Sequence, residues 1–417
     1  MCKFFSPGER ERVGTGSEAP IPVAQSWLVV DVMVKLPGGS GESVSLKTCI
    51  RVIAILTAGL YSATLQGQGA SLPQAPLSAT SVTGTDIGDR VNRALKSCGL
   101  QCTVYIPAGN YSFSTTIHLE LNPFGKYKLS GDPGAVLTYT GSGDAILTPV
   151  NNLAGSSQVL IEGFQLHGNA HASAGIHTMP TNRITIRNMV IAGFSDGILV
   201  EGTNSSNIYD NLIANNKNGI RLIPTLCGGQ PIQCGASVSG SPFASNAIHI
   251  TYNQITNNAQ WAIFEDTVMV GHGLSEALNN LYMGNDFEEN GGAIYVTRSR
   301  GTVIEANYFE ESPRQVVLGL ANGGSGYRAY GPVVRDNYFT TLTGTPYNIE
   351  VVNADSALIE GNSELVASLG PRNCFVNMTG ATRSWIGKNA IYQKNAYCFN
   401  GVPGTPPAGD GSFFFGR

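Results

Sequence analysis

Acidic residues end two of three successive short apolar segments in the middle of the chain. Glu201 ends the first segment, and the pair Glu265–Asp266 ends the third, at an equivalent place. If the segments are strands stacked about 4.8 Å apart, Glu201 and the outward acid of the Glu265–Asp266 pair are two layers, or about 9.6 Å, apart. Inverting glycosidases separate acid and base by a similar distance, which leaves room for water. The three carboxyl groups are therefore candidate catalytic residues, and solvated strand-end acids are the alternative.

The register of the third segment is open by one residue. A slip of one position would exchange which of Glu265 and Asp266 points outward.

A second chemistry that these residues allow is β-elimination from a uronate. It needs a cation to neutralise the sugar carboxylate and a base at the neighbouring carbon. Arg298, Arg300 and Arg328 offer guanidinium groups that match a carboxylate bidentately. His272 or Tyr295 would be the base. We expect Arg298 and His272 to be catalytic, and Arg300, Arg328 and Tyr295 to bind substrate.

Neither chemistry requires a cofactor, although calcium is a candidate ligand. Glu288–Glu289 and Glu310–Glu311 occupy the same positions of adjacent repeats. Four carboxylates stacked in steps of about 5 Å could hold Ca²⁺. The alternative is a surface cluster offset by Arg314 or solvent. We predict no zinc site, because the spacing of the histidines fits no ligand set.

A repeat must position these side chains. Residues 182–223 contain the same pattern twice: a short aliphatic strand, an Asn at a turn, a second strand and a Gly-Ile strand. The two copies align when Asn188 is placed over Asn211. The same Asn mark recurs six times downstream, at Asn253, Asn285, Asn307, Asn337, Asn362 and Asn389. Repeats of this length indicate a solenoid whose coils differ in loop length.

Residues at fixed distances from the recurrent Asn show which kind of solenoid the repeats form. Three residues before it the side chains are apolar throughout, and two residues after it they are apolar except for Glu364. The position directly after the Asn holds both polar and apolar residues. This alternation predicts strands with one face turned inward. Asn tolerates a left-handed bend, and its amide can bond the amide of the next coil. The pattern predicts an all-β parallel β-helix of about ten coils.

Three insertions interrupt the repeat at 224–245, 267–278 and 319–330. Each follows the strand that begins at Gly-Ile or its equivalent, so all three should emerge on one edge of the solenoid. The third carries Tyr327, a candidate substrate-binding residue beside Arg328. The short connection Arg298-Ser-Arg300 lies between the second and third insertions. We expect a groove with loop walls and a basic floor.

The start of the repeat resembles a known superfamily. Asp86–Lys96 has the pattern of a short amphipathic helix, and Thr103–Phe113 reads TVYIPAGNYSF, a strand, a Pro-Gly turn and a strand. Here the chain resembles the pectin-lyase-like superfamily of right-handed parallel β-helices, whose N-terminal helix plugs the first coil. The resemblance covers roughly 82–400. It implies the fold but no single activity, since the superfamily holds hydrolases, lyases, epimerases, tailspikes and adhesins.

One member family shares shorter motifs with the chain. Gly271-His272-Gly273 looks like the GHG signature of polygalacturonases, family-28 glycoside hydrolases, and Ser195–Ile198 loosely resembles their NTDG. The next coil has Lys217-Asn218 where that family places paired Asp. The family's catalytic carboxylates therefore do not carry over, and a chance GHG in a Gly-rich loop is the alternative.

The N-terminal segment indicates export. Residues 1–46 look like no folded unit and are interpreted as a non-native or disordered extension. Residues 47–70 have the basic, apolar and small-residue order of a signal peptide, and the apolar run Val52–Leu60 is too short to span a bilayer. We expect the β-helix to occupy 82–400 and a Pro/Gly-rich tail, 401–417, to fold back over the last coil.

Six cysteines remain after that segment, in three close pairs. They suggest the disulfides Cys98–Cys102, Cys227–Cys234 and Cys374–Cys398, which fit a secreted or periplasmic location. The net charge is −4, so nucleic acid is an unexpected partner. No membrane span is expected after signal removal, and the sequence does not indicate the oligomeric state.

We therefore predict a secreted protein that cleaves an acidic, uronate-containing polysaccharide by hydrolysis or β-elimination. The alternative is a non-catalytic, adhesin-like β-helix that binds glycan at a surface.

Overall fold

The computed structural model describes residues 28–34, 44–50, 76–98, 101–119, 125–148, 158–225, 244–267, 276–320, 328–341, 346–366, 374–390, 397–399, 402–403 and 413–415. The chain divides into two units, Met1–Ala70 and Ser71–Arg417. In the first, β1 (Leu28–Val34) and β2 (Val44–Ile50) form an antiparallel hairpin. A lone two-stranded hairpin is marginally stable in water. The extension over 1–46 and the signal peptide over 47–70 stay predictions.

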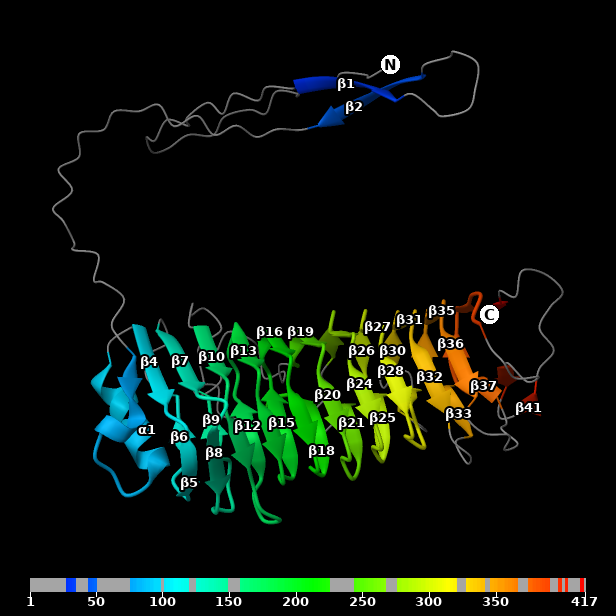
Figure 1. Ribbon diagram of the computed structural model, residues 1–417. Coiled ribbons are helices and arrows are strands. Elements are labelled where there is room, and N and C mark those ends of the chain that lie inside the picture. The colour runs from blue at the N-terminus through cyan, green and yellow to red at the C-terminus, as the bar shows by residue number, and fades with distance from the viewer. Residues whose placement is uncertain are drawn as a thin grey trace, which may run out of the picture. The chain divides into compact units, whose positions relative to one another are not determined.

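The second unit is a parallel β-helix, which confirms the predicted fold class (Figure 1). Each coil passes through three sheets, here called sheets I, II and III in chain order, and the later coils add a short fourth, sheet IV. Apart from β41 (Val402–Pro403) and β42 (Phe413–Phe415), which pair antiparallel, each strand pairs in parallel with its counterpart one coil away, so residues more than twenty positions apart in sequence become neighbours. In the described residues sheet II has ten strands, one per coil, in agreement with the predicted solenoid of about ten coils.

The strands of sheet I are β3 (Leu77–Ser78), β4 (Gln101–Ile106), β7 (Lys126–Gly131), β10 (Gln158–Glu162), β13 (Ile184–Arg187), β16 (Asn204–Tyr209), β19 (Asn246–Thr251), β23 (Leu281–Met283), β27 (Val303–Glu305), β31 (Val333–Arg335), β35 (Leu358–Glu360), β39 (Ser384–Ile386) and β42 (Phe413–Phe415). Those of sheet II are β5 (Gly109–Phe113), β8 (Ala135–Tyr139), β11 (Gln165–His167), β14 (Val190–Ala192), β17 (Leu212–Ala214), β20 (Gln254–Thr256), β24 (Asp286–Glu288), β28 (Tyr308–Glu310), β32 (Tyr338–Thr341) and β36 (Ser363–Val366).

Sheet III comprises β6 (Ile117–His118), β9 (Ile146–Leu147), β12 (Ala174–Thr178), β15 (Asp196–Glu201), β18 (Asn218–Ile223), β21 (Trp261–Glu265), β25 (Gly292–Val296), β29 (Val316–Leu318), β33 (Tyr347–Val351), β37 (Cys374–Met378), β40 (Tyr397–Phe399) and β41 (Val402–Pro403). Sheet IV comprises β22 (Ala277–Leu278), β26 (Ser299–Arg300), β30 (Ala329–Tyr330), β34 (Ala354–Asp355) and β38 (Ala381–Thr382).

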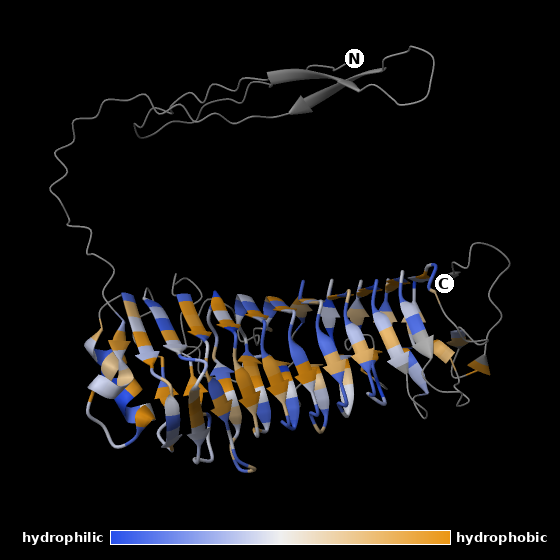
Figure 2. Ribbon diagram, viewed as in Figure 1, coloured by the Kyte–Doolittle hydropathy of each residue, from blue (hydrophilic) through white to orange (hydrophobic). Residues whose placement is uncertain are grey.

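The core consists of stacked columns of like side chains, and apolar residues accordingly mark the strands in Figure 2. Phe287, Phe309 and Phe339 are fully buried and lie one above another, with ring centroids 5.0 and 4.7 Å apart. Their strands pair in register, Phe287 with Phe309 and Phe309 with Phe339. This is the column that the sequence pattern predicts two residues after the recurrent Asn.

The recurrent Asn residues form a buried amide ladder at the turn between sheets I and II. Each side-chain amide donates to the Oδ1 of the next coil's Asn at 2.9–3.1 Å, from Asn211 to Asn389. A second, shorter ladder joins Asn216, Asn258 and Asn290 at the turn between sheets II and III. The ladders satisfy buried amides that would otherwise be costly.

Two details of the predicted turn were wrong. Met189, not Asn188, lies over Asn211, because Val190 pairs with Leu212 and Met189 N donates to Asn211 Oδ1. The left-handed residue is the one before the ladder Asn, for example Asp210 with φ 54°. Asn188 has that conformation itself, with φ 52°, which explains why it resembled the ladder residues.

The ends of the solenoid are covered. Helix α1 (Ile87–Ser97), which follows the 3₁₀ helix η1 (Ala79–Ser81), begins at the N-cap Asp86, which accepts from Asp89 N. Asp86 also accepts from Ser114 N, so the cap ties the helix to the first coil. At the other end β42 pairs antiparallel with β39, the predicted return of the tail. Each end of the stack thus has a partner segment, α1 at the first coil and β42 at β39.

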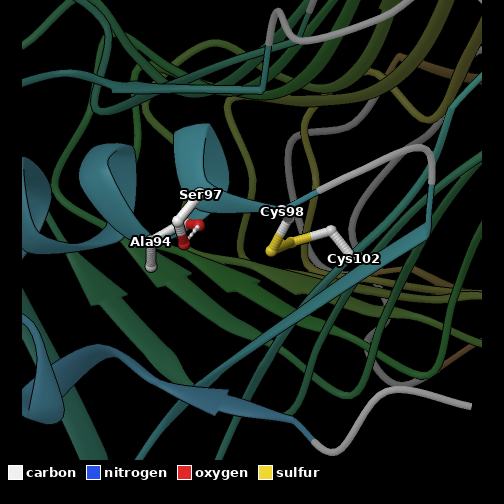
Figure 3. Close-up of a disulfide and its surroundings, with 4 residues drawn as sticks. All are labelled: Ala94, Ser97, Cys98 and Cys102. Atoms are coloured by element: carbon white, nitrogen blue, oxygen red, sulfur yellow. Dashed lines mark hydrogen bonds between the residues drawn. A yellow bond between two sulfur atoms is a disulfide. The ribbon is translucent and has the colours of Figure 1, made fainter.

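Two predicted disulfides are present. Cys98–Cys102 joins the end of α1 to β4, beside the hydrogen bond from Ser97 Oγ to Ala94 O (Figure 3). Cys374–Cys398 links consecutive coils of sheet III, with a Cα–Cα distance of 5.7 Å. The predicted Cys227–Cys234 pair lies outside the described residues.

Candidate functional site

The outward surface of sheet III gathers charged and aromatic side chains that lie far apart in sequence. We call this surface the sheet III face and define it by Asp144, His177, Asp196, Glu201, Arg221, Trp261, Phe264, Asp266 and Tyr295. Its central row is in register across four coils: Leu199 pairs with Arg221, Arg221 with Phe264, and Phe264 with Tyr295. The N-terminal part of the face is charged and the next coils are aromatic.

His177 links two carboxyl groups in the first part of the face. Its Nδ1 lies 2.7 Å from Asp144 Oδ2 and its Nε2 lies 2.9 Å from Glu201 Oε2. Burial opposes protonation of the imidazole, but the two carboxylates outweigh it and raise the pKa of His177 to about 9. His177 is therefore a cation at neutral pH. Glu201, 3 % exposed, also lies 3.3 Å from Thr225 Oγ1.

Arg221 lies between two further carboxyl groups. Its Nη2 donates to Asp266 Oδ2 at 2.6 Å, and its Nη1 lies 3.8 Å from Asp196 Oδ2. Asp196 accepts a second hydrogen bond from Asn218 Nδ2 at 2.8 Å. Burial nevertheless raises the pKa of Asp196 above its usual value. One guanidinium thus brings together an aspartate whose pKa is raised by burial and an aspartate held by a charge-assisted hydrogen bond.

Three half-buried aromatic rings continue the face beyond Arg221. Phe264 and Tyr295 stack with centroids 5.4 Å apart and planes 12° apart, and Trp261 lies 5.0 Å from Tyr295. Arg221 lies over the Phe264 ring at 5.7 Å. Gly292 makes room for the indole, because an added Cβ would lie 2.4 Å from the Trp261 ring. Such a platform suits the apolar faces of sugar rings.

The structure resolves which of the paired acids faces outward. Asp266 is the outward one, in line with Ile223 and Glu201, since Leu222 pairs with Glu265 and Glu201 with Ile223. Glu201 and Asp266 thus lie two coils apart along one edge, as the sequence predicts. Glu265 points into the solenoid instead and is 0 % exposed.

Glu265 belongs to an internal polar cluster, and its side chain lies on the opposite side of β21 from the sheet III face. It accepts a short hydrogen bond from the Tyr282 hydroxyl, and Asn280 and Thr302 donate to it at 3.3 and 3.4 Å. Burial raises the pKa of Glu265 to about 7, despite these donors. A group with no access to solvent cannot reach a polysaccharide, so we omit Glu265 from the site.

The three arginines predicted for the site, Arg298 as a catalytic residue and Arg300 and Arg328 as substrate-binding residues, lie on sheet IV or at its edge. Arg300 contacts Glu276 at 3.3 Å and lies over the Tyr330 ring, while Arg328 donates to Asn353 Oδ1 at 3.0 Å. Arg298 has Nε and Nη1 buried without a hydrogen-bond partner in the described residues. Tyr295, also predicted to bind substrate, lies on the sheet III face. His272 and Tyr327 lie outside the described residues, as do most of the three insertions that were predicted to form the walls.

The candidate calcium residues stack as predicted, but no cation site accompanies them. Glu288 and Glu310 pair in register on sheet II, beside Asp286, whose pKa burial and the two neighbouring carboxylates raise to about 6. Glu289 and Glu311 occupy the following left-handed turn positions. Within the described ranges no group of three or more His, Cys, Asp or Glu is arranged to hold a metal.

Sequence reasoning missed most of the charged part of the face. Asp144, His177, Asp196 and Arg221 come from four different coils. Asp196 was weighed only within the NTDG-like Ser195–Ile198 and set aside, and the candidate acid and base were taken from strand ends. Asp196 is the first residue of its strand. Its alignment with Asn218 in the next coil was the sequence signal that could have placed it on this face. The central row required the alternation of sheet III to be followed through every coil, which places His177, Leu199, Arg221 and Phe264 in one line.

Comparison with solved structures supports the fold and no particular activity. The DFA-IIIase of Arthrobacter chlorophenolicus A6, in complex with DFA-III, is 15% identical, with a TM-score of 0.52, over 76% of this chain and 83% of that chain. ORF18 of Geobacillus virus E2 is 13% identical, with a TM-score of 0.50, over 77% and 62%. PfbA, a surface adhesin of Streptococcus pneumoniae, is 14% identical, with a TM-score of 0.48, over 78% and 90%. A search of curated protein sequences found no match.

A family profile described as "Periplasmic copper-binding protein (NosD)" matches residues 136–344. The histidine of the sheet III face and the disulfide-bonded cysteines do not fit copper. Both ring nitrogens of His177 bond carboxylates and are protonated at neutral pH, so neither offers a lone pair. The four described cysteines that follow α1 are joined in disulfides.

The family's periplasmic description agrees with the export predicted from the N-terminal segment and the cysteines. In the part of the chain that the structure describes, no helix is long and apolar enough to cross a bilayer. The profile covers just over half of the 417 residues. The chain therefore belongs to the NosD family of parallel β-helix proteins.

Proposed function

We propose that the sheet III face binds a carbohydrate chain and hydrolyses a glycosidic bond in it. The observation that carries this proposal is the Asp196–Arg221–Asp266 group beside the aromatic platform of Trp261, Phe264 and Tyr295. General acid–base hydrolysis requires two carboxyl groups, one to donate a proton and one to accept it. Aromatic rings provide the sugar-binding surface next to them.

The charge of the face favours a neutral sugar chain near the carboxyl groups. Carboxylates outnumber cations there, and the nearest cations, His177 and Arg221, are already engaged by acids. A uronate brought to the same place would meet repulsion. The predicted preference for an acidic polysaccharide therefore finds no support at this site, whereas the predicted polysaccharide class remains part of the proposal.

The roles follow from the environment of each carboxyl group. Asp196, whose pKa is raised by burial, donates its proton to the glycosidic oxygen as the bond to the anomeric carbon breaks. Asp266 accepts a proton from the attacking water, whose oxygen forms the new bond to that carbon. Arg221 positions both carboxyl groups. Glu201, held by His177, remains the second candidate base.

Hydrolysis is better supported than β-elimination. Elimination would need a guanidinium free to face the substrate. Arg221 on the sheet III face is bonded to Asp266, Arg300 is paired with Glu276, and Arg328 with Asn353. Arg298 has Nε and Nη1 buried at the edge of sheet IV. The carboxyl groups and the aromatic platform, in contrast, share one surface.

Binding without cleavage is the second candidate function. This function is favoured because the carboxyl groups of the face already have partners. Arg221 donates to Asp266, and His177 lies between Asp144 and Glu201. Such contacts would also suit a rigid recognition surface.

One assay tests both candidates. Full-length protein is incubated with neutral and acidic polysaccharides while reducing ends and ultraviolet absorbance are followed. New reducing ends without a rise in ultraviolet absorbance would support hydrolysis. The Asp196→Asn variant should lose this activity, and the Asp286→Asn variant, changed on sheet II, should retain it. Absorbance that rises with the reducing ends would refute hydrolysis in favour of elimination. Glycan retention without new ends would leave binding alone.

A further inference from the structure

A second concave surface lies on sheet I, across the first coils of the solenoid. It is an open depression of about 580 Å³. Its floor is formed by β4, β7, β10, β13 and β16, which pair in parallel and in register. It shares no lining residue with the sheet III face.

The charged residues that line this depression are all cations. They are Lys126, Lys128, Arg183 and Arg187. Glu162, just outside the lining, contacts Lys128 Nζ at 2.5 Å and Arg187 Nε at 2.7 Å. One carboxylate therefore offsets two of the four cations. Lys126 and Arg183 are exposed and have no ion-pair partner among the described residues.

The cations recur on alternate coils. Lys126 pairs with Gln158, and Arg183 occupies the same position one strand further along, since Val159 pairs with Ile184. Lys126 and Arg183 are thus two coils, or about 9.6 Å, apart. The intervening coil contributes the neutral Gln158 and Leu160. A ligand with negative groups at about that interval would meet both cations at once.

Six of the remaining lining residues are polar and uncharged. They are Gln101, Thr103, Gln158, Thr185, Ser205 and Asn207. Amides and hydroxyls both donate and accept hydrogen bonds, which matches sugar hydroxyl groups. A site that combines guanidinium and ammonium groups with amides and hydroxyls has the composition needed for an acidic carbohydrate.

The same lining disfavours nucleic acid. Single-stranded nucleic acid requires aromatic rings on which bases stack. Tyr127 is 2 % exposed, and the Tyr209 ring lies under Arg187 at 5.9 Å. The net charge of −4 also supplies no long-range attraction for a polyanion.

We propose that this sheet I groove binds an acidic carbohydrate chain whose negative groups contact Lys126 and Arg183. The inference does not depend on hydrolysis at the sheet III face. It assigns the predicted acidic ligand to a different surface, where the protein offers charge complementarity instead of repulsion.

Binding of defined oligosaccharides to the full-length protein tests the proposal. The probes are a hyaluronan hexasaccharide, in which acidic and neutral sugars alternate, its carboxyl-reduced counterpart and single-stranded oligodeoxythymidine. Calorimetry should detect the acidic probe, with affinity that falls as salt is raised. The Lys126→Gln/Arg183→Gln variant should bind it about tenfold more weakly.

A matched control lies on the same sheet. Arg335 contacts Glu305 at 2.9 Å, as Arg187 contacts Glu162, but it lies outside the groove. Arg335→Gln should bind like the wild type, and so should Trp261→Ala on the sheet III face. Thermal unfolding of each variant verifies the fold. The proposal is overturned if the wild type ignores the acidic probe, binds the reduced probe or oligodeoxythymidine equally well, or keeps its affinity in the double variant.

Discussion

The sheet III face and the sheet I groove use the same scaffold in opposite ways. Both are outward surfaces of parallel strands with polar side chains in register. On the sheet III face the cations His177 and Arg221 are each enclosed by two carboxyl groups, so the surface is acidic. In the sheet I groove a single carboxylate, Glu162, forms ion pairs with two of the cations, Lys128 and Arg187. The other two, Lys126 and Arg183, are exposed.

The difference shows how a solenoid separates functions. The inward residues of each strand are fixed by the stacked core, whereas the outward residues can vary from coil to coil without disturbing it. Charge sign and aromatic content can therefore be set independently on two sheets of one coil. A substitution on one surface should therefore leave ligand binding at the other surface unchanged, so the two proposals can be tested separately.

The largest expected effect is loss of cleavage in Asp266→Asn. The change removes the proposed base and its contact with Arg221, and should lower the rate of glycan hydrolysis about a thousandfold. Release of reducing ends from the preferred polysaccharide measures it. The Lys126→Gln/Arg183→Gln variant should hydrolyse the neutral substrate at the wild-type rate. Equal loss in both variants would mean that the two surfaces act as one.

The next effect concerns Glu265, which joins the two sheets from inside through Tyr282 of β23. Its pKa is raised by burial from 4.5 to about 7, so the folded state holds a proton that the unfolded state releases. The free energy of unfolding should therefore fall as pH rises from about 4.5 to 7, by about 3 kcal/mol, and stay level above that range.

Glu265→Gln should remove this contribution, because a neutral amide does not ionise. Urea unfolding at pH 5 and pH 8 measures the difference, and Glu276→Gln on sheet IV is the control. A wild-type protein whose stability does not fall between these values, or a Glu265→Gln variant with the same fall, would contradict the internal position of the acid.

A smaller effect is expected from Gly292→Ala. The added Cβ would lie 2.4 Å from the Trp261 ring and should displace the indole without removing it. Affinity for the neutral glycan should fall up to about tenfold, as for Trp261→Ala, while the sheet I groove keeps its ligand. Gly134→Ala, whose Cβ would come no closer than 3.3 Å to its neighbours, is the matched control. Unchanged glycan affinity in Gly292→Ala would remove Trp261 from the platform.

The fold could be predicted because each coil repeats the same local physics. The columns of Ile208, Ile250 and Ile304, and of Phe287, Phe309 and Phe339, are visible in sequence as residues at fixed distances from an Asn. Only the first unit was misaligned, by one position, because a left-handed Asn188 stood beside the true ladder position of Met189.

The site could be predicted only in part, because it depends on side chains that do not repeat. Glu201 and Asp266 were placed correctly by counting along the strand edge. The partners that decide their chemistry, His177 and Arg221, come from the strand centres of other coils. The register of Glu265 also depended on one position that sequence alone leaves open.

The amide ladder from Asn211 to Asn389 has one more consequence. Each amide-to-amide bond joins only neighbouring rungs, the same amides also bond nearby backbone groups, and all rungs are chemically identical. A gene that gained or lost one whole coil would close the gap with the same bonds. Such a protein can therefore change its length in steps of one coil and extend either outer surface, while its interior needs no redesign.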